Sequence, residues 1–384
     1  MKTPVETRAV RVPTPSRGSE APVMVEVFAL SDVGQTRDHN EDAYVVADLA
    51  EGVPILFDAG EGGRAVRRAV GASGHLFMVA DGMGGAAAGE LASETAINTV
   101  LRHLREHWAP TRGSDPGAFV ESLERATDVA NAVIYRHASE HPELRGMGTT
   151  ATIAGLLGDT LYLAQVGDSR AYLIRGGTAR QITKDQSLMQ KLIEAGEMTE
   201  EEAEQSERRN IILQALGPEA AIKIDLTYQQ VRRGDVLVLC SDGLSGIVRG
   251  DEIARAFSEE PDLPSACRRL VATANALGGP DNITIVSARF EGSALLPPND
   301  DDHVGHQTFA IPGREMAPGD SVEELMRAKT EQMEAVFQTT PLELPAAVRA
   351  ERRERSLPVR GVLAAAAVVL AGYLAWRLVQ LLAR

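Results

Sequence analysis

The sequence predicts an α+β fold, in which short strands form sheets and longer helices pack against them. Three observations favour this class. Several short apolar runs have the length of strands and end at glycine or at turn residues. Two longer segments carry apolar positions at helical spacing. The chain has 384 residues, 44% of them hydrophobic, which is enough for one large domain or two ordinary ones.

The first half of the chain begins with residues 1–22, which contain several prolines and arginines without periodicity and predict a disordered lead-in. A folded domain is expected over 23–291. Its first expected strands are 24–31, 43–46, 76–80, 149–156, 161–166 and 170–174, and its first expected helices are 86–108 and 115–139. Residues 49–74 form a Gly-rich excursion whose role the sequence leaves open.

The second half of this domain opens with residues 184–217, which are polar and rich in Glu. They predict a mobile cover over the core, with helical pieces at 187–195 and 199–207. The remaining expected elements are a wholly apolar strand at 236–240, helices at 251–258 and 263–276, and a last strand at 283–290.

Composition changes at residue 292, where prolines and an acidic run at 300–302 predict a linker that reaches residue 360. Residues 321–337 can form one amphipathic helix in it, with Ser321 as N-cap and Glu324 at the capping-box position. Residues 361–383 are apolar and almost uncharged, and they predict a single-pass transmembrane tail anchor. The preceding arginines predict an inner (cytoplasmic) membrane location with the folded domain in the cytoplasm.

Charge and cysteine content limit the classes of function. The formal net charge of −15 predicts no general affinity for nucleic acid, so any phosphate contact must come from a local site. Cys240 and Cys267 are the only cysteines, which excludes a disulfide-rich scaffold and favours a reducing compartment.

Carboxylates follow or precede several of the expected strands, namely Glu41, Asp42, Asp81, Asp168, Asp242 and Asp281. Taken alone, Asp81 is better explained as the cap of the helix that follows it. However, Asp242 repeats the same pattern of buried strand, acid and glycine. No Cys or supporting His accompanies these acids, so an oxygen-only set favours Mg²⁺ or Mn²⁺ over zinc. Two such ions can clamp a phosphate ester for hydrolysis, and Arg37 can bind its phosphate.

Six short motifs containing these residues occur in one order along the chain. They are R-x-x-N-E-D-A (from Arg37), A-D-G-M-G-G (from Ala80), M-G-T-T-A-T (from Met147), V-G-D-S-R (from Val166), S-D-G-L (from Ser241) and G-P-D-N-I-T (from Gly279). Over about residues 25–290 the chain therefore resembles the protein phosphatase 2C family, the metal-dependent serine/threonine phosphatases of bacterial type. The resemblance implies a four-layer αββα sandwich of two antiparallel sheets flanked by helices.

The resemblance also implies roles for individual residues. Asp81 would bridge two Mn²⁺ or Mg²⁺ ions, and the Gly82 carbonyl would bind one of them. The other implied ligands are Asp242 and Asp281 for the first ion, Glu41 and Asp42 for the second, directly or through water, and Asp168 for a weaker third ion. Arg37 would bind the substrate phosphate. Residues 184–217 correspond to the flap beside the family's cleft, with Asp185, Gln186, Ser187 and Asn210 as its candidate site residues.

Three positions depart from the family pattern. Met83 stands where some members have a His that protonates the leaving group, so the general acid stays open. Gly246 replaces an Asp that often helps to hold the third ion, and Gln186 replaces a common His at the start of the flap. None of the three removes an acid of the two main metal sites.

The implied activity is hydrolysis of phosphoserine and phosphothreonine in proteins, with a metal-bridging hydroxide as nucleophile. The expected partners are Ser/Thr-phosphorylated proteins, among them kinases and their substrates, and the membrane through the C-terminal helix; the protein is expected to be a monomer. The alternative is a catalytically weak adaptor that binds phosphoproteins while tethered to the membrane. Divalent-ion binding and turnover distinguish the two hypotheses.

Overall fold

The computed structural model describes residues 22–50, 53–56, 63–111, 113–206, 208–260, 262–299 and 302–311. The expected linker helix at 321–337 and the expected tail anchor at 361–383 lie outside these residues, as does nearly all of the N-terminal lead-in. Within the described ranges, no helix combines the length and the apolar character that crossing a bilayer requires.

Two six-stranded sheets form the centre of the domain, and all their neighbouring strands are antiparallel. The first sheet has the order β11 (Thr178–Gln181), β10 (Arg170–Arg175), β13 (Val236–Cys240), β14 (Ile283–Glu291), β1 (Met24–Asp32) and β4 (Val66–Ala69). The second has the order β12 (Asp225–Gln230), β9 (Thr160–Val166), β8 (Ala151–Leu157), β5 (His75–Ala80), β2 (Ala43–Asp48) and β3 (Val53–Leu56).

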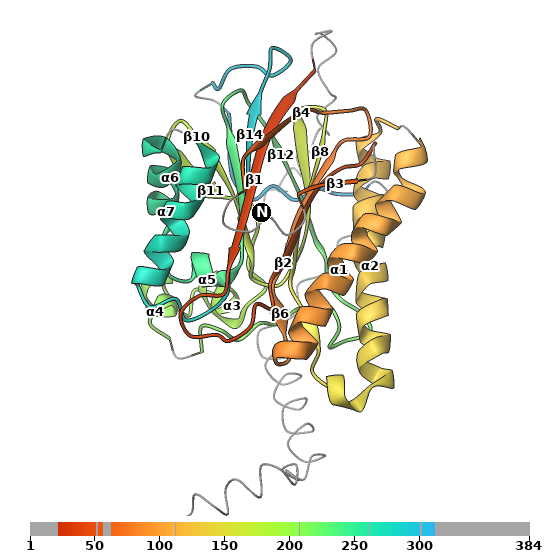
Figure 1. Ribbon diagram of the computed structural model, residues 1–384, viewed down its shortest axis with the longest axis vertical. Coiled ribbons are helices and arrows are strands. Elements are labelled where there is room, and N and C mark those ends of the chain that lie inside the picture. The colour runs from red at the N-terminus through yellow and green to blue at the C-terminus, as the bar shows by residue number, and fades with distance from the viewer. Residues whose placement is uncertain are drawn as a thin grey trace, which may run out of the picture. The chain divides into compact units, whose positions relative to one another are not determined.

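Helices cover the outer face of each sheet (Figure 1). The pair α1 (Ala86–His107) and α2 (Pro116–Glu140) packs on the second sheet, and the pair α6 (Gly250–Glu259) and α7 (Leu263–Ala276) packs on the first. The short elements are α3 (Leu188–Glu194), α4 (Glu200–Glu204), α5 (Asp242–Ser245), the ribbon of β6 (Gly82–Met83) with β7 (Gly148–Thr149), and 3-10 turns at Ala109–Thr111 and Pro142–Leu144.

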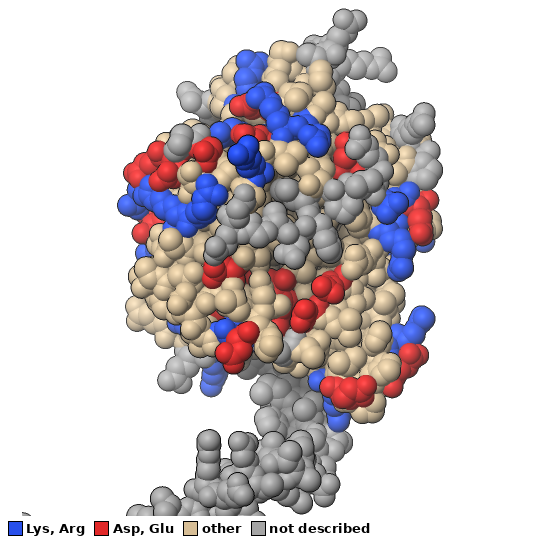
Figure 2. Space-filling model, viewed as in Figure 1, with Lys and Arg blue, Asp and Glu red and all other residues tan. Residues whose placement is uncertain are grey.

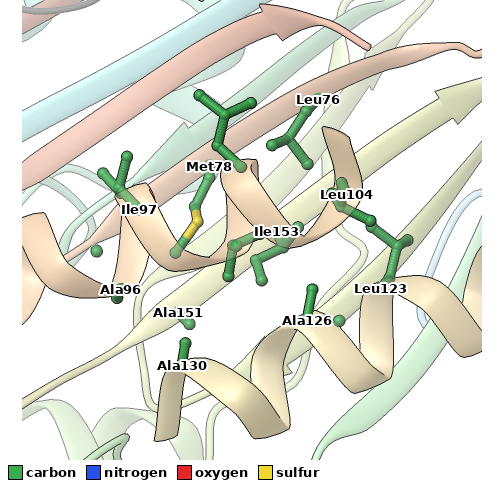
Figure 3. Packing of buried hydrophobic residues seen from close by; sticks show 14 of the residues in the cluster. Leu76, Met78, Ala96, Ile97, Leu104, Leu123, Ala126, Ala130, Ala151 and Ile153 are labelled. Atoms are coloured by element: carbon green, nitrogen blue, oxygen red, sulfur yellow. The ribbon is translucent and has the colours of Figure 1, made fainter. Parts of the chain in front are cut away.

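Three apolar clusters separate these layers, and β5 takes part in two of them. Its residue Met78 faces α1 and α2, where it lies near Ile97 and Ile153 (Figure 3). Its neighbour Phe77 points the other way, between the sheets, and meets the Phe290 ring edge-on at 6.5 Å. Because side chains alternate along a strand, a strand that is apolar over five successive residues, as β5 is from Leu76 to Ala80, belongs between two covered faces. The four-layer sandwich implied by the resemblance is therefore confirmed.

The expected strands and helices of the domain occur within a few residues of their predicted bounds, but four strands of the two six-stranded sheets and the short strand β6 were not predicted. Strands β3 and β4 lie in the 49–74 excursion, and β11 and β12 lie on either side of the flap. All four are edge strands. β4 has the sequence VRRA and β11 has TARQ, and such short polar segments lack the apolar alternation that identifies a strand.

The packed part of the chain extends past the predicted boundary at residue 291. Residues 302–311 run along β12, where the Tyr228 N–H donates to the Gln307 carbonyl and the Phe309 N–H donates to the Leu226 carbonyl. Phe309 is buried in the cluster beneath α1 and α2. The prolines and the acidic run at 300–302 predicted a linker here, whereas the packing of these residues depends on β12, which is distant in the sequence.

Candidate metal centre

Five aspartates from different parts of the chain meet at one end of the sandwich. Asp81 directly follows β5, Asp242 lies two residues after the end of β13, Asp42 directly precedes β2, Asp168 lies between β9 and β10, and Asp281 precedes β14. The negative charges of the other four all raise the pKa of Asp81, which places the five within electrostatic reach of one another. The structure therefore brings together strand ends from both sheets.

Burial and mutual repulsion shift the pKa values of these acids upward. Burial is the largest cause of the raised pKa of Asp81, followed by Asp42 and Asp242. Burial also raises the pKa of Asp42 to about 7, although a hydrogen bond from Ser241 opposes the shift. The pKa of Asp168 is raised for the same first reason, with Asp242 as the next cause. Keeping all of these carboxylates ionised therefore costs free energy, unless a bound cation neutralises part of their negative charge.

Three buried carboxylate oxygens at this point lack any hydrogen-bond partner: Asp42 Oδ1, Asp168 Oδ1 and Asp242 Oδ1. Burying a polar atom without a partner is costly, and a hard cation is the partner that such oxygens suit. In the described part of the chain, no three His, Cys, Asp or Glu side chains form a complete ligand set as they lie. Mg²⁺ usually takes only one or two carboxylates and keeps several waters, so these acids fit such an ion.

Gly82 holds the start of α1 close to the acids. Its N–H donates to the Glu41 carbonyl at 3.2 Å. A Cβ at this position would lie 2.3 Å from the Gly89 carbonyl oxygen and 2.5 Å from that of Glu41, so only glycine fits. The N-cap of α1 is Gly85, and the helix-cap explanation of Asp81 is therefore wrong.

Hydroxyl groups that the sequence analysis did not weigh orient two of the acids. The Asp81 N–H donates to Thr150 Oγ1 at 2.9 Å, and Thr149 Oγ1 donates to the Asp81 carbonyl at the same distance. Ser241 Oγ donates to Asp42 Oδ2 at 2.7 Å. All three hydroxyls stand inside the quoted motifs, but only the acids of those motifs were treated as site residues.

Asn282 is a second residue that the sequence analysis missed. Its Oδ1 accepts from the Glu41 N–H at 2.8 Å, and its Nδ2 donates to the carbonyls of Val33 and His39. The amide thus fixes the loop that carries Glu41 against the start of β14. The signal was its place directly after Asp281 in G-P-D-N-I-T.

Arg37 lies beside these acids, with its Nη2 2.8 Å from Asp281 Oδ2. Its side chain is 48% exposed, and it interacts electrostatically with Glu41 and Asp81. A guanidinium can bind a phosphate through two parallel hydrogen bonds. An exposed arginine beside a group of acids can therefore receive an anion that would otherwise be repelled there.

A polar cleft of about 620 Å³ adjoins the acids and continues to the flap. Among the residues that line it are Arg37, Asp168, Asp185, Ser187, Arg209, Asn210, Asp242, Arg249 and Asp281. The other predicted site residues, Glu41, Asp42, Asp81, Gly82 and Gln186, are not among its lining residues. A smaller, mainly apolar cavity of about 290 Å³ lies near Val70, Leu157 and Tyr162, and none of the acids of the metal centre lines it.

Asp185 is held in an ion pair, so it does not face the cleft as a free acid. Arg170 Nη2 lies 2.7 Å from Asp185 Oδ2, Arg170 Nε donates to the same carboxylate, and Gln181 Nε2 donates to it at 2.8 Å. The Asp185 side chain is 9% exposed. This pair joins β10 to the start of the flap.

The other predicted flap residues have different surroundings. Gln186 Oε1 accepts from the Gly167 N–H at 3.0 Å, and Gln186 Nε2 donates to the Lys223 carbonyl at 2.9 Å. Ser187 caps α3 by accepting from the Gln190 N–H. Asn210 is exposed in the cleft wall. Gln186 therefore joins the two ends of the flap region to the loop that carries Asp168.

Figure 2 shows one face of the domain with acidic and basic side chains interspersed. Among its described residues, this face has no continuous basic surface. The residues that line the cleft include both arginines and acids, among them Arg37, Arg209 and Arg249.

A family profile and individual relatives both match this chain to the family that the sequence motifs resemble. A family profile described as protein phosphatase 2C matches residues 65–283. The serine/threonine protein phosphatase PstP of Mycobacterium tuberculosis is 40% identical over 219 residues, which is 56% of this chain and only 40% of PstP. The serine/threonine phosphatase stp of Listeria welshimeri is 34% identical over 67% of this chain and 92% of its own length.

Solved structures agree with this result. The catalytic domain of PstP in complex with two manganese ions superposes with a TM-score of 0.56 at 34% identity, covering 70% of this chain and all of that one. Stp1 of Staphylococcus aureus gives a TM-score of 0.60 at 30% identity and covers 73% of this chain. The chain therefore belongs to the protein phosphatase 2C family, and the relatives it matches are serine/threonine protein phosphatases.

Proposed function

We propose that this protein removes phosphate from phosphoserine and phosphothreonine in other proteins, with two Mn²⁺ or Mg²⁺ ions as cofactors. The observation that carries the proposal is the group of five aspartates, three of which have a buried oxygen without a hydrogen-bond partner, next to an exposed arginine in a cleft. The manganese ions in the PstP catalytic domain support the metal requirement. Family membership supports the reaction class.

The proposed ligands follow the positions of the acids. Asp81 would bridge both ions, with Asp242 and Asp281 on the first. The Gly82 carbonyl would bind one of the two ions, Glu41 and Asp42 would hold the second directly or through water, and Asp168 would hold a weaker third ion. When bound, such ions supply a water nucleophile that is deprotonated at neutral pH, and positive charge near the phosphate oxygens.

The residues of the chain orient the substrate. Arg37 would release Asp281 and hold the phosphate dianion through two hydrogen bonds, which aligns the phosphorus with the metal centre. The flap side of the cleft, including Asn210, would contact the peptide around the phosphorylated residue. Met83 has no proton to donate, so the leaving oxygen must be protonated by water or by another group of the cleft.

The test uses the full-length protein with a phosphothreonine peptide, with and without Mn²⁺. We expect turnover only with the ion, and Asp242→Asn should lower kcat by about 100-fold or more because it removes a metal ligand. Asp251→Asn is the matched control, since that acid is 77% exposed on α6. Full activity of Asp242→Asn would contradict the proposed site, and phosphopeptide binding without turnover would favour the adaptor hypothesis.

We also propose that residues 361–383 anchor the protein in the inner membrane with the catalytic domain in the cytoplasm. The apolar run and the basic residues before it support this arrangement. In that location the substrates would be cytoplasmic proteins phosphorylated by Ser/Thr kinases, and the kinases themselves.

A further inference from the structure

Residues 302–311, here called the strap, add a further strand-like segment to the free edge of the second sheet. Thr308 pairs antiparallel with Thr227 of β12, and two backbone hydrogen bonds of 2.8 and 2.9 Å flank this pair. β12 is an edge strand in the sheet order. The strap therefore covers backbone groups that an uncovered edge would leave open to other chains.

Side chains fix the strap at both of its ends. At the start, Asp302 forms a two-pronged ion pair with Arg232 at 2.6 and 2.7 Å, and both side chains are at most 15% exposed. Near the end, Phe309 is 5% exposed and meets the rings of Tyr162 and Tyr228 edge-on, at 5.7 and 6.2 Å. The buried aromatic ring and the largely buried ion pair thus hold the strap against the domain through specific contacts.

The middle of the strap holds the first residue of β12. His306 Nε2 lies 2.7 Å from Asp225 Oδ2, and the Phe309 N–H donates to the carbonyl of Leu226, the next residue. Asp225 directly follows residues 218–224, here called the return segment, which lead from the flap back to the sheet. The strap thus binds the chain at the start of β12, the point where the chain leaves the flap region.

The return segment is tied to the flap by two glutamine side chains. The Lys223 N–H donates to Gln214 Oε1 at 3.0 Å, and Gln186 Nε2 donates to the Lys223 carbonyl at 2.9 Å. Gln186 also accepts from the Gly167 N–H, next to Asp168. A displacement of β12 would therefore also move both ends of the flap and the loop that carries Asp168.

We propose that the strap is a positioning element for the flap: by holding the start of β12 it sets the wall of the cleft that receives the peptide part of the substrate. The proposal rests on the proposed phosphatase function. The strap lies beyond the residues matched by the family profile, 65–283, so this control would come from outside the matched domain. Small aryl phosphates need Arg37 and the acids but not the flap, so they should be insensitive to it.

The experiment compares strap variants of the full-length protein on two substrates with Mn²⁺ present. Phe309→Ala and Asp302→Asn should each raise KM for a phosphothreonine peptide by about fivefold or more, with kcat and KM for a small aryl phosphate within about twofold. Phe309→Leu should restore most of the peptide KM. Thr308→Ala is the control, because that side chain is exposed on the same segment.

Hydrogen exchange gives a readout that does not depend on activity. We expect faster exchange over 184–224 in Phe309→Ala and Asp302→Asn, at a temperature where both remain folded, and no change there in Thr308→Ala. Faster exchange confined to 225–230, unchanged exchange, or an equal loss on both substrates would overturn the proposal. Wild-type protein inactive on both substrates would instead contradict the phosphatase function, while the exchange comparison would still test the strap.

Discussion

Asp81 interacts with all the other aspartates of the site, and both its burial and these four neighbouring charges raise its pKa. Without metal, the folded protein must either keep this charge among other acids or take up a proton. Both outcomes cost free energy relative to the unfolded chain, and the cost grows as the pH rises above the ordinary pKa of 3.8.

Asp81→Asn should therefore have opposite effects on activity and on metal-free stability. We expect kcat to fall by about 100-fold or more, about 3 kcal/mol in the barrier, because the bridging ligand is lost. We expect the Tm in EDTA at pH 8 to rise, because a neutral amide avoids both costs. Kinetics with Mn²⁺ and thermal unfolding measure the two effects, and Asp251→Asn should change neither. A lower metal-free Tm would contradict the repulsion argument.

His75 is a buried titratable residue of β5 outside the metal centre. Its side chain is fully buried, neither ring nitrogen has a hydrogen-bond partner, and Asp48 Oδ2 lies 3.9 Å from Nε2. Burial lowers its pKa below the ordinary 6.5, although Asp48 opposes the shift. The unfolded chain thus binds a proton that the folded protein resists, so stability is lost as the pH falls below 6.5.

His75→Leu should remove this pH dependence. Between pH 7.5 and 5, the wild type should lose stability relative to His75→Leu by up to about 1.4 kcal/mol per pH unit. Urea unfolding in EDTA at several pH values measures the difference. If the free energy of unfolding depends on pH in the same way in both proteins, the imidazole is protonated equally in the folded and unfolded states, which would contradict the burial argument.

At the scale of single elements, Gly82 in β6 sets the approach of α1 to the acids. Gly82→Ala would push a methyl group into the backbones of Gly89 and Glu41, so the start of α1 must move away from Asp81. We expect Mn²⁺ affinity to fall by about 10- to 100-fold, measured by calorimetry. Gly117→Ala in α2 is the control, since its nearest contact would be an ordinary 3.6 Å. Equal affinity in both variants would contradict this role.

A buried ion pair joins the end of β10 to the turn before β13. Arg175 Nη2 lies 2.6 Å from Asp235 Oδ2, and the two side chains are 9% and 0% exposed. Asp235→Ala would leave the guanidinium buried without its counter-charge, and we expect it to destabilise the fold by about 3–5 kcal/mol in urea unfolding. Asp251→Ala, whose partner Arg255 is exposed at 3.9 Å, should change stability by about 0.5 kcal/mol at most. Comparable losses would contradict the burial argument.

At the scale of the whole molecule, we expect the proposed tail anchor to determine where the protein is located and the folded domain to carry the catalytic activity. Removing residues 361–384 should move the protein from the membrane to the soluble fraction, because it removes the apolar run and leaves the domain intact. Cell fractionation measures the shift. Activity on the phosphopeptide should stay within about twofold, since the proposed metal ligands all lie before residue 282. Unchanged membrane association would contradict the anchor.

Much of the fold was predictable because its central strands are marked locally. β5 is apolar from Leu76 to Ala80 and β13 is apolar throughout, and an acid followed by glycine comes within two residues of the end of each strand. The six motifs then identified the family, and with it the acids of the site. Strands β11 and β12 escaped prediction because their sequences, TARQ and DLTYQQ, are mostly polar and leave no clear apolar periodicity.

By itself, the sequence determined which segments are buried strands and helices, which acids stand at strand ends, and the family, because each depends on local periodicity or on short motifs. Only the tertiary structure decided which of these residues meet. Ser241 bonds Asp42 across 199 positions of the chain, and the strap reaches β12 from beyond the matched domain. Such contacts depend on the pairing of distant strands, which no local pattern of residues encodes.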